Sequence, residues 1–168
     1  MDKTLKEYLE AHKIKYIEHK HLPVFTVEEH HKLMSQDPSV LHTKNLFLKD
    51  EKKSFFLVSM YANKQLDLKA LRRKLHAKKK LSFASSEQLK ENLNLSPGSV
   101  SIFGMINDNE HKVNLIVDKQ VWEAEKVGFH PNINTSTLEI SHEDLEKFYN
   151  SLKSPKQILD LDSPEEDE

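Results

Sequence analysis

Two short apolar segments joined by a charged turn constrain the fold more than any other feature of the chain. Residues 46–49 alternate leucine with phenylalanine and lysine, and residues 54–60 form a second, longer apolar run. Side chains that alternate in this way point to opposite faces of a sheet. The polar residues 50–53 between the two runs are typical of a turn. We therefore predict a central β-hairpin, with Lys44 and Asn45 at its mouth.

Lys44 has two interpretations at this position. Most lysines in proteins are exposed and solvated, so Lys44 could simply mark the end of a strand. The alternative is that this cation, held beside an apolar hairpin, contacts a ligand. The hairpin alone does not decide between them.

Helices and short strands alternate along the rest of the chain. Capping residues and apolar stripes predict helices over 3–12, 26–35, 67–76 and 85–93 and a last helix after Ser141. Apolar runs predict strands over 14–19, 113–118 and 135–140, a short helical turn over 121–124 and a polar loop over 129–135. This alternation predicts a single α/β (α+β) domain with a mixed sheet flanked by helices.

Length and composition limit the class of protein. The chain has 168 residues, enough for one domain with its own core, and it has no cysteine, which excludes disulfides and a cysteine nucleophile. The first residues carry charges where a signal peptide needs an apolar run, and no stretch is apolar and long enough to span a membrane. We expect a soluble, cytoplasmic protein that does not bind membranes.

The charge is distributed unevenly. The formal net charge is −2, but residues 160–168 hold six of the 27 acids and no base, which leaves 25 bases against 21 acids, or +4, in residues 1–159. We expect a folded domain over 1–159 and an acidic, disordered tail over 160–168.

A second charged stretch is basic. Between residues 69 and 80 the chain has no acid and seven bases, namely Lys69, Arg72, Arg73, Lys74, Lys78, Lys79 and Lys80. Such a run is commonly a solvated helix face. The alternative is a patch that contacts phosphates, which would add affinity for a nucleic acid but little sequence specificity.

Most familiar catalytic motifs are absent. The ten histidines include no HExxH motif, and the adjacent His30 and His31 would point about 100° apart on a helix, so we predict no metal site. Phosphate loops, dinucleotide-binding fingerprints and serine-esterase elbows are missing as well, and no cofactor is predicted. Small polar groups on separate loops remain as candidates.

Several segments, in order and at consistent spacing, resemble one known family. They are Val24-Phe25-Thr26-Val27-Glu28-Glu29, Thr43-Lys44-Asn45-Leu46-Phe47-Leu48, Leu81-Ser82-Phe83-Ala84-Ser85, Pro97-Gly98-Ser99-Val100, Phe103-Gly104-Met105-Ile106-Asn107-Asp108 and residues 129–137. Over about residues 3–160 the chain is similar to the YbaK family of free-standing prolyl-tRNA editing proteins, which are related to the insertion domain of bacterial prolyl-tRNA synthetases. The resemblance implies a barrel-like mixed sheet.

The resemblance also implies an activity and a site. It implies a trans-editing deacylase that hydrolyses the ester of mischarged tRNA(Pro), with Ala-tRNA(Pro) as the first candidate, tRNA(Pro) as partner and prolyl-tRNA synthetase as a second candidate partner. Lys44 would stabilise developing charge during catalysis. The residues that would bind substrate or shape the pocket are Asn45, Gly98, Ser99, Val100, Ser101, Gly104, Asn107, His130, Asn134 and Thr135. The bases Lys69, Arg72, Arg73, Lys78, Lys79 and Lys80 would be candidates for tRNA contact.

One position departs from the family pattern. Ile102 stands where many relatives are expected to have proline in the loop that begins at Gly98. Because proline fixes φ, its loss leaves this loop freer and leaves open which amino acid is removed. Serine, threonine or cysteine esters, a tRNA- or synthetase-binding module without catalysis, and a general RNA-binding scaffold therefore remain as alternatives.

Overall fold

The computed structural model describes residues 1–22 and 39–162. The predicted helix over 26–35 and residues 163–168 of the predicted acidic tail lie outside this range. Along the chain the described elements are α1 (Lys3–Ala11), β1 (Ile17–Lys20), β2 (Val40–Lys49), β3 (Phe55–Tyr61), α3 (Leu68–Lys74), β4 (Ser82–Phe83), α4 (Ser86–Leu93), η1 (Ile102–Asn107), β5 (Val113–Asp118), α5 (Lys119–Glu123), β6 (Lys126–Phe129), β7 (Ser136–Ser141), α6 (His142–Ser151) and β8 (Lys156–Leu159).

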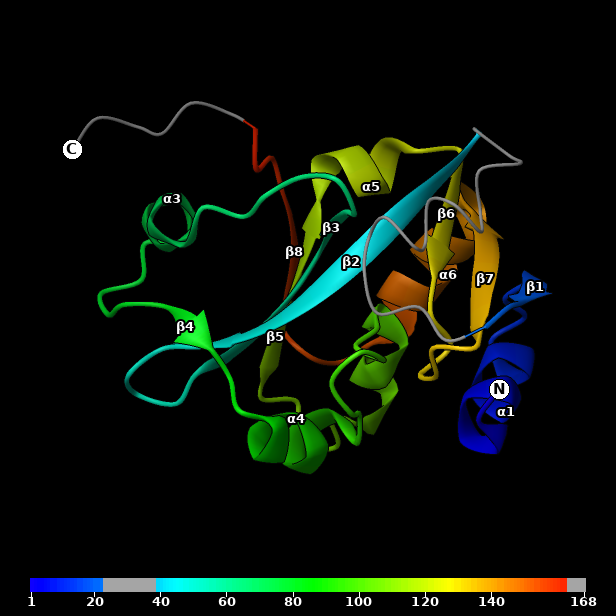
Figure 1. The fold of residues 1–168 in the computed structure, drawn as a ribbon, viewed down its shortest axis with the longest axis horizontal. Coiled ribbons are helices and arrows are strands. Elements are labelled where there is room, and N and C mark those ends of the chain that lie inside the picture. The colour runs from blue at the N-terminus through cyan, green and yellow to red at the C-terminus, as the bar shows by residue number, and fades with distance from the viewer. Residues whose placement is uncertain (23–38, 163–168) are drawn as a thin grey trace.

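One mixed sheet of eight strands organises the domain. Its order is β1-β7-β6-β2-β3-β5-β8, and β4 pairs with β2 beside this path. β2 pairs antiparallel with β3 and parallel with β6, so it joins the two halves of the sheet, as the long cyan arrow in Figure 1 shows. The predicted single mixed α/β domain is confirmed.

Local sequence signals explain where the helices begin. Asp67 accepts hydrogen bonds from the backbone N–H groups of the first turn of α3, and Ser85 forms the capping box that opens α4. Ser141 caps α6 through a 3.2 Å bond from Asp144 N to its Oγ. These caps were predicted, and each satisfies backbone donors that have no partner within the helix. Among the described residues no helix is both long and apolar enough to cross a membrane.

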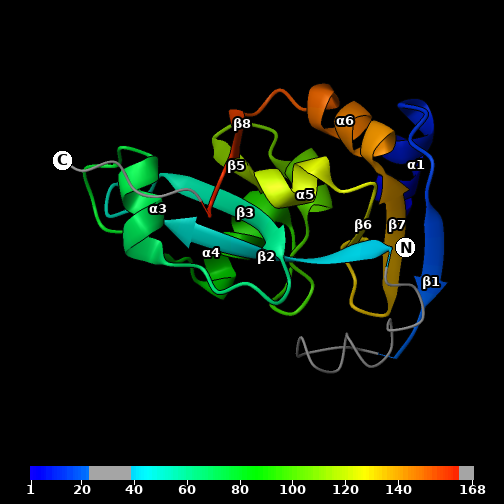
Figure 2. The ribbon, with the colours of Figure 1, turned by 90° about the horizontal axis from the view of Figure 1, so that it is seen from above.

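The sheet separates two apolar clusters. The main core lies on one face, beneath α1, α4, η1 and α6, and includes Phe47, Phe103, Phe129 and Phe148. The second core lies on the opposite face, beneath α3, and consists of Leu48, Val58, Met60, Leu71, Leu81 and Ile116. Figure 2 shows α3 at one end of the molecule and α1 with β1 at the other.

The central hairpin is longer than predicted. β2 begins at Val40, so Lys44 and Asn45 lie inside the strand, opposite Met60 and Ser59 of β3, and not at its mouth. The reason is that the first residues of β2 pair with β6, a strand far along the chain that lies partly in the segment predicted to be a loop. A local pattern contains no signal for such a partner.

The end of the described chain packs against the domain. Lys64 Nζ lies 2.6 Å from Asp118 Oδ2 and 2.8 Å from Asp162 Oδ2, and Leu161 N donates to Asp118 Oδ1. Lys74 Nζ donates to the carbonyl of Asp160. Residues 160–162, predicted to be part of the tail, therefore contact the folded body.

Candidate functional site

The sheet face opposite the main core is polar where β2, β6, β7 and β1 lie side by side (Figure 1). Residues in register across neighbouring strands point to the same face. Register pairs His42 with Gly128, Gly128 with Glu139, and His19 with Thr137. We call these five residues the polar face. His42, Thr137 and Glu139 are only 7%, 1% and 9% exposed, so their polar groups are largely withdrawn from water.

Gly128 allows two of these side chains to approach each other. A Cβ atom at this position would lie 2.9 Å from His42 Nδ1 and 3.1 Å from Thr137 Cγ2, closer than side chains tolerate. The carbonyl of Gly128 also accepts a 2.7 Å hydrogen bond from Thr43 Oγ1. The glycine therefore lets His42 and Thr137 pack over β6, and the hydrogen bond fixes β2 against it.

Lys44 extends the polar face. It follows His42 by two residues on β2, so both side chains point to the same side of the sheet. The next residue on this side, Leu46, packs against the second core, so Lys44 lies where polar face and second core meet. Burial lowers the pKa of its ammonium group below the ordinary 10.5. Among the described residues no carboxylate lies within ion-pair distance of Lys44.

His130 comes directly after β6. The pairing of β2 with β6 ends at His42 and Gly128, and both Lys44 and His130 come two residues later. The His130 ring lies 6.2 Å from that of His21, and His21 Nε2 is 2.9 Å from Thr137 Oγ1. Lys44 and His130 therefore both come after the point at which β2 and β6 stop pairing.

The hydrogen bonding of His130 defines its tautomer. Its Nδ1 lies 3.1 Å from the carbonyl oxygen of Ser136, which can only accept, so Nδ1 carries a proton. Burial lowers the pKa of His130 from 6.5, and nearby His21 lowers it further, against the opposing effect of the Ser136 bond. The ring is therefore neutral at pH 7, with Nε2 as its acceptor.

One stretch of the β2 edge is not paired with any strand among the described residues. β6 covers this edge up to His42, and β4 covers it again from Leu48 onward. The carbonyl of Phe47 accepts from Ala84 on this edge, whereas that of His42 accepts from Ala62 beside β3. Because the direction alternates along an antiparallel strand, the backbone groups of Asn45 point to the edge between β6 and β4.

Two buried acceptors lie beside this opening. Asn45 is 8% exposed and Ser59, its register partner, is fully buried. Neither Asn45 Oδ1 nor Ser59 Oγ has a hydrogen-bond partner among the described residues. Buried polar atoms without partners are uncommon in folded proteins and are often found at functional sites.

The glycine loop packs on the other side of the sheet. η1 contributes Ile102, Phe103 and Met105 to the main core, the side to which Asn45 and not Lys44 points. Ser101 Oγ caps η1 by accepting from Phe103 N. Gly98 occupies an exposed turn with φ 88°, and the neighbouring Ser99 and Val100 are half-buried. The structure therefore associates this loop with Asn45, the neighbour of Lys44.

Two predicted site residues have structural contacts. A Cβ at Gly104 would lie 2.5 Å from Leu95 Cδ1, so this glycine permits close packing of η1 on the segment after α4. Asn107 Nδ2 donates to the carbonyl of Leu93 and joins the same two elements. Both residues lie within the scaffold that holds the loop.

The loop between β6 and β7 contains the remaining predicted residues. Asn134 is half-buried, and Thr135 is exposed and accepts a hydrogen bond from His21 N through its carbonyl. The sequence analysis missed Asn132, which has φ 64° and a buried amide without a partner among the described residues. It also missed His42 and Thr137; the spacing of two between His42 and Lys44 was the available signal.

The basic run lies on and after α3. Arg72 donates to the carbonyl of Lys78, and Lys74 to that of Asp160, so these two cations are held by the protein. Lys69, Arg73 and residues 78–80 are exposed. The run covers the end of the molecule beyond the second core.

Comparison with known proteins identifies the family. Residues 21–148 match the model of the aminoacyl-tRNA editing domain, which covers most of the chain. The chain belongs to the aminoacyl-tRNA editing domain family. The matched region includes β2, η1, β6 and β7, and it contains every residue of the polar face except His19.

Individual relatives agree with this assignment. The editing domain is 40% identical over 154 residues to the prolyl-tRNA editing protein ProX of Acetoanaerobium sticklandii, covering 91% of this chain and 93% of that one. It is 33% identical over 162 residues to prolyl-tRNA synthetase associated domain-containing protein 1 of Danio rerio, covering 95% and 87%. A solved structure described as "a putative trans-editing enzyme for prolyl tRNA synthetase" has the same fold, with a TM-score of 0.73, 15% identity and coverage of 98% and 99%.

The lowered pKa of His130 predicts how stability depends on pH. Between the lowered pKa and 6.5 the unfolded chain binds a proton at this residue and the folded editing domain does not, so the free energy of unfolding falls as the pH is lowered through this window. We expect His130→Asn, whose amide can still donate to Ser136, to show a smaller loss between about pH 7 and about pH 5.5 in urea unfolding. The exposed, left-handed His111 provides the control His111→Asn, which should keep the wild-type dependence. An unchanged dependence in His130→Asn would contradict the assignment.

Proposed function

We propose that this editing domain is a trans-editing deacylase, which hydrolyses the ester between a wrong amino acid and tRNA(Pro). The observation that carries the proposal is the half-buried Lys44 ammonium, which has no carboxylate partner among the described residues and lies on the same side of the sheet as His42 of the polar face. The names of the relatives, a prolyl-tRNA editing protein and proteins associated with prolyl-tRNA synthetase, support tRNA(Pro) as the partner.

The chemistry would proceed by attack of water on the ester carbonyl. Negative charge develops on the carbonyl oxygen, and a fixed cation withdrawn from water stabilises that charge more than a solvated one. Lys44 would supply the cation. Asn45 would bind the substrate through its edge-facing backbone, and His130 would contact the substrate or orient the loop that follows β6. The proton of the water leaves on the ribose oxygen as the ester bond breaks.

Alanine is the amino acid that we propose is removed. A synthetase pocket built for proline rejects a smaller residue by only about 1–3 kcal/mol, so a second, smaller site is needed to remove it. The proline ring would be too large for this site. Ile102 is fully buried in the main core, on the side of the sheet away from Lys44, so it would affect this size limit only through the packing of η1.

A panel of mischarged tRNAs tests this function. The protein is incubated with Ala-, Ser-, Thr-, Cys- and Pro-tRNA(Pro), and the loss of amino acid is followed against a buffer control. We expect Ala-tRNA(Pro) to be hydrolysed fastest and Pro-tRNA(Pro) to be spared. Faster hydrolysis of another ester would change the substrate. Hydrolysis of none, together with tight tRNA binding and no effect of Ile102→Pro, would show a binding module without catalysis.

A further inference from the structure

Phe83 is an exposed aromatic side chain in a basic surface. It forms the end of β4 and is 59% exposed, whereas most other phenylalanines of the described chain lie in or against the cores. A single exposed apolar residue is ordinary on a protein surface. The basic residues near Phe83 distinguish it from such a residue.

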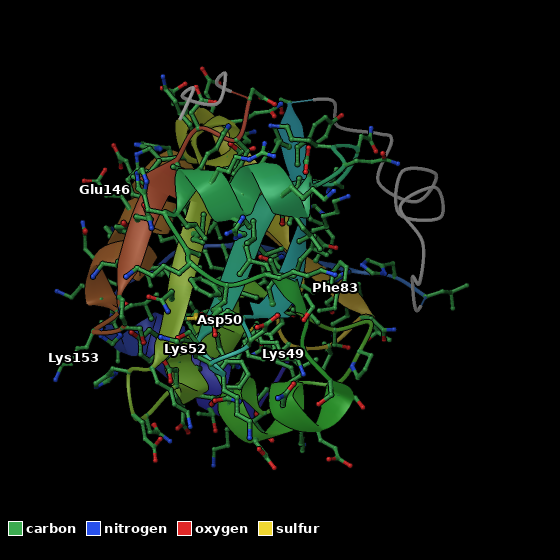
Figure 3. The ribbon with its side chains drawn as sticks, turned by 90° about the vertical axis from the view of Figure 1, so that its left-hand side faces the viewer. Lys49, Asp50, Lys52, Phe83, Glu146 and Lys153 are labelled. Carbon is green, nitrogen blue, oxygen red and sulfur yellow. The ribbon has the colours of Figure 1, made fainter. Side chains whose placement is uncertain are left out.

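Three exposed lysines precede Phe83 in the sequence. They are residues 78–80, shortly before β4, whereas Lys49 of β2 is in register with Ser82 and so points to the opposite face of the sheet from Phe83. Phe83 and Lys49 lie on the same side of the molecule, below α3 in Figure 3. The nearby Asp50 is held in its own turn, where its Oδ1 accepts from Lys52 N and Ser54 N.

The position of Phe83 relative to Lys44 adds a second observation. Phe83 is in register with Leu48, so it adjoins the same sheet face as Lys44, four residues away along β2. At about 3.3 Å per residue this separation is about 13 Å, a span that a few unpaired nucleotides cover. β4 also borders the stretch of the β2 edge to which the backbone of Asn45 points.

From this placement we infer that Phe83 stacks on a base of the single-stranded 3′ end of the tRNA, while residues 78–80 contact its phosphates. The inference rests on the proposed function for its choice of RNA, the 3′ end of a tRNA. An aromatic side chain within a positively charged groove is the usual arrangement by which proteins bind single strands. Lys44 and Phe83 would then contact two points of one RNA strand, and the lysines of residues 78–80 would add affinity without sequence preference.

Binding of uncharged RNA tests the inference separately from catalysis. The probe is a short fluorescein-labelled RNA ending in CCA, measured by anisotropy with wild type, Phe83→Ala, Phe83→Tyr and Ile158→Ala. We expect about tenfold weaker binding for Phe83→Ala, because one stacked base is lost, and near wild-type binding for Phe83→Tyr. Ile158, an exposed residue of β8 at the far edge of the sheet, provides the control that should bind as the wild type.

Salt dependence separates stacking from phosphate contact. Replacing residues 78–80 with alanine should make the fall of affinity with salt less steep, by about 0.7 in log–log slope for each phosphate that is no longer neutralised, whereas Phe83→Ala should leave the slope unchanged. Wild-type affinity of Phe83→Ala, an equal loss in Ile158→Ala, or no detectable binding of the probe by the wild type would overturn the inference. So would weakened binding of Phe83→Ala to purified prolyl-tRNA synthetase with RNA affinity intact.

The two proposals can fail separately. If no mischarged tRNA is hydrolysed but Phe83→Ala still weakens RNA binding, the deacylase function is wrong and the RNA surface stands. If Ala-tRNA(Pro) is hydrolysed and Phe83→Ala has wild-type kcat/KM and RNA affinity, the RNA surface is wrong and the deacylase function stands.

Discussion

Replacing Lys44 with alanine should lower kcat/KM for Ala-tRNA(Pro) by about 100-fold or more, the usual effect of losing one group that stabilises a developing oxyanion. Lys44 lies on a strand between His42 and Leu46, and its ammonium group has no carboxylate partner among the described residues, so its removal leaves no buried charge unpaired. The variant should therefore keep the wild-type circular dichroism spectrum and urea midpoint. Initial rates of deacylation, measured alongside these, check both statements.

Two further variants make the Lys44 test specific. Lys44→Arg keeps the charge but replaces a compact ammonium with a planar, longer group, and we expect it to remain impaired. Lys126→Ala removes an exposed lysine of β6, in register with Val40, and should keep full activity. Full activity of Lys44→Ala would remove this residue from the mechanism, and equal losses in Lys44→Ala and Lys126→Ala would indicate a general effect of charge.

The rate of deacylation should depend on pH through the proton on Lys44. Burial lowers the pKa of Lys44, so it loses its proton at lower pH than an ordinary lysine. The enzymatic rate above the buffer control should decline on the alkaline side as this proton is lost.

The local parts of the fold were predictable because the signals lie close together in the sequence. Ser85 with Gln88, and Ser141 with Asp144, are each three residues apart and form the predicted caps. The strand over 113–118 was also predicted with the observed bounds, since its apolar run is unbroken enough to stand out. Such elements can be predicted from their own residues alone.

The parts that sequence reasoning missed depend on distant partners. β6 has only four residues, including Gly128, and forms because β2 lies on one side and β7 on the other. The extra length of β2 follows from the same pairing. The polar face was therefore predicted only in part: Lys44 and His130 were named, but His42 and Thr137 become neighbours only once β6 lies between their strands.

Replacing Lys64 with methionine should cost about 3–5 kcal/mol of the free energy of unfolding, the largest stability effect that we expect from the ion pairs described here. Its Nζ lies 2.6 Å from the carboxylate of Asp118, which is fully buried. Burial alone would lower the pKa of Lys64, but the hydrogen bonds and charges of Asp118 and Asp162 outweigh it and raise the pKa. Without Lys64, Asp118 keeps the N–H of Leu161 but has no cation in hydrogen-bond distance among residues 1–22 and 39–162.

A matched set of variants separates this buried pair from an ordinary surface pair. Lys119 and Glu123 lie 3.8 Å apart with more than half of each side chain exposed, so Lys119→Met should change stability by at most about 0.5 kcal/mol. Asp162 is 63% exposed, so Asp162→Asn should also have a small effect. The double variant Lys64→Met with Asp118→Leu should recover part of the loss, because no charge is then left buried. Urea unfolding of the four variants measures these losses of stability. Equal losses for Lys64→Met and Lys119→Met would contradict the prediction. They would mean that Asp118 finds water or another partner and that burial of its charge contributes little.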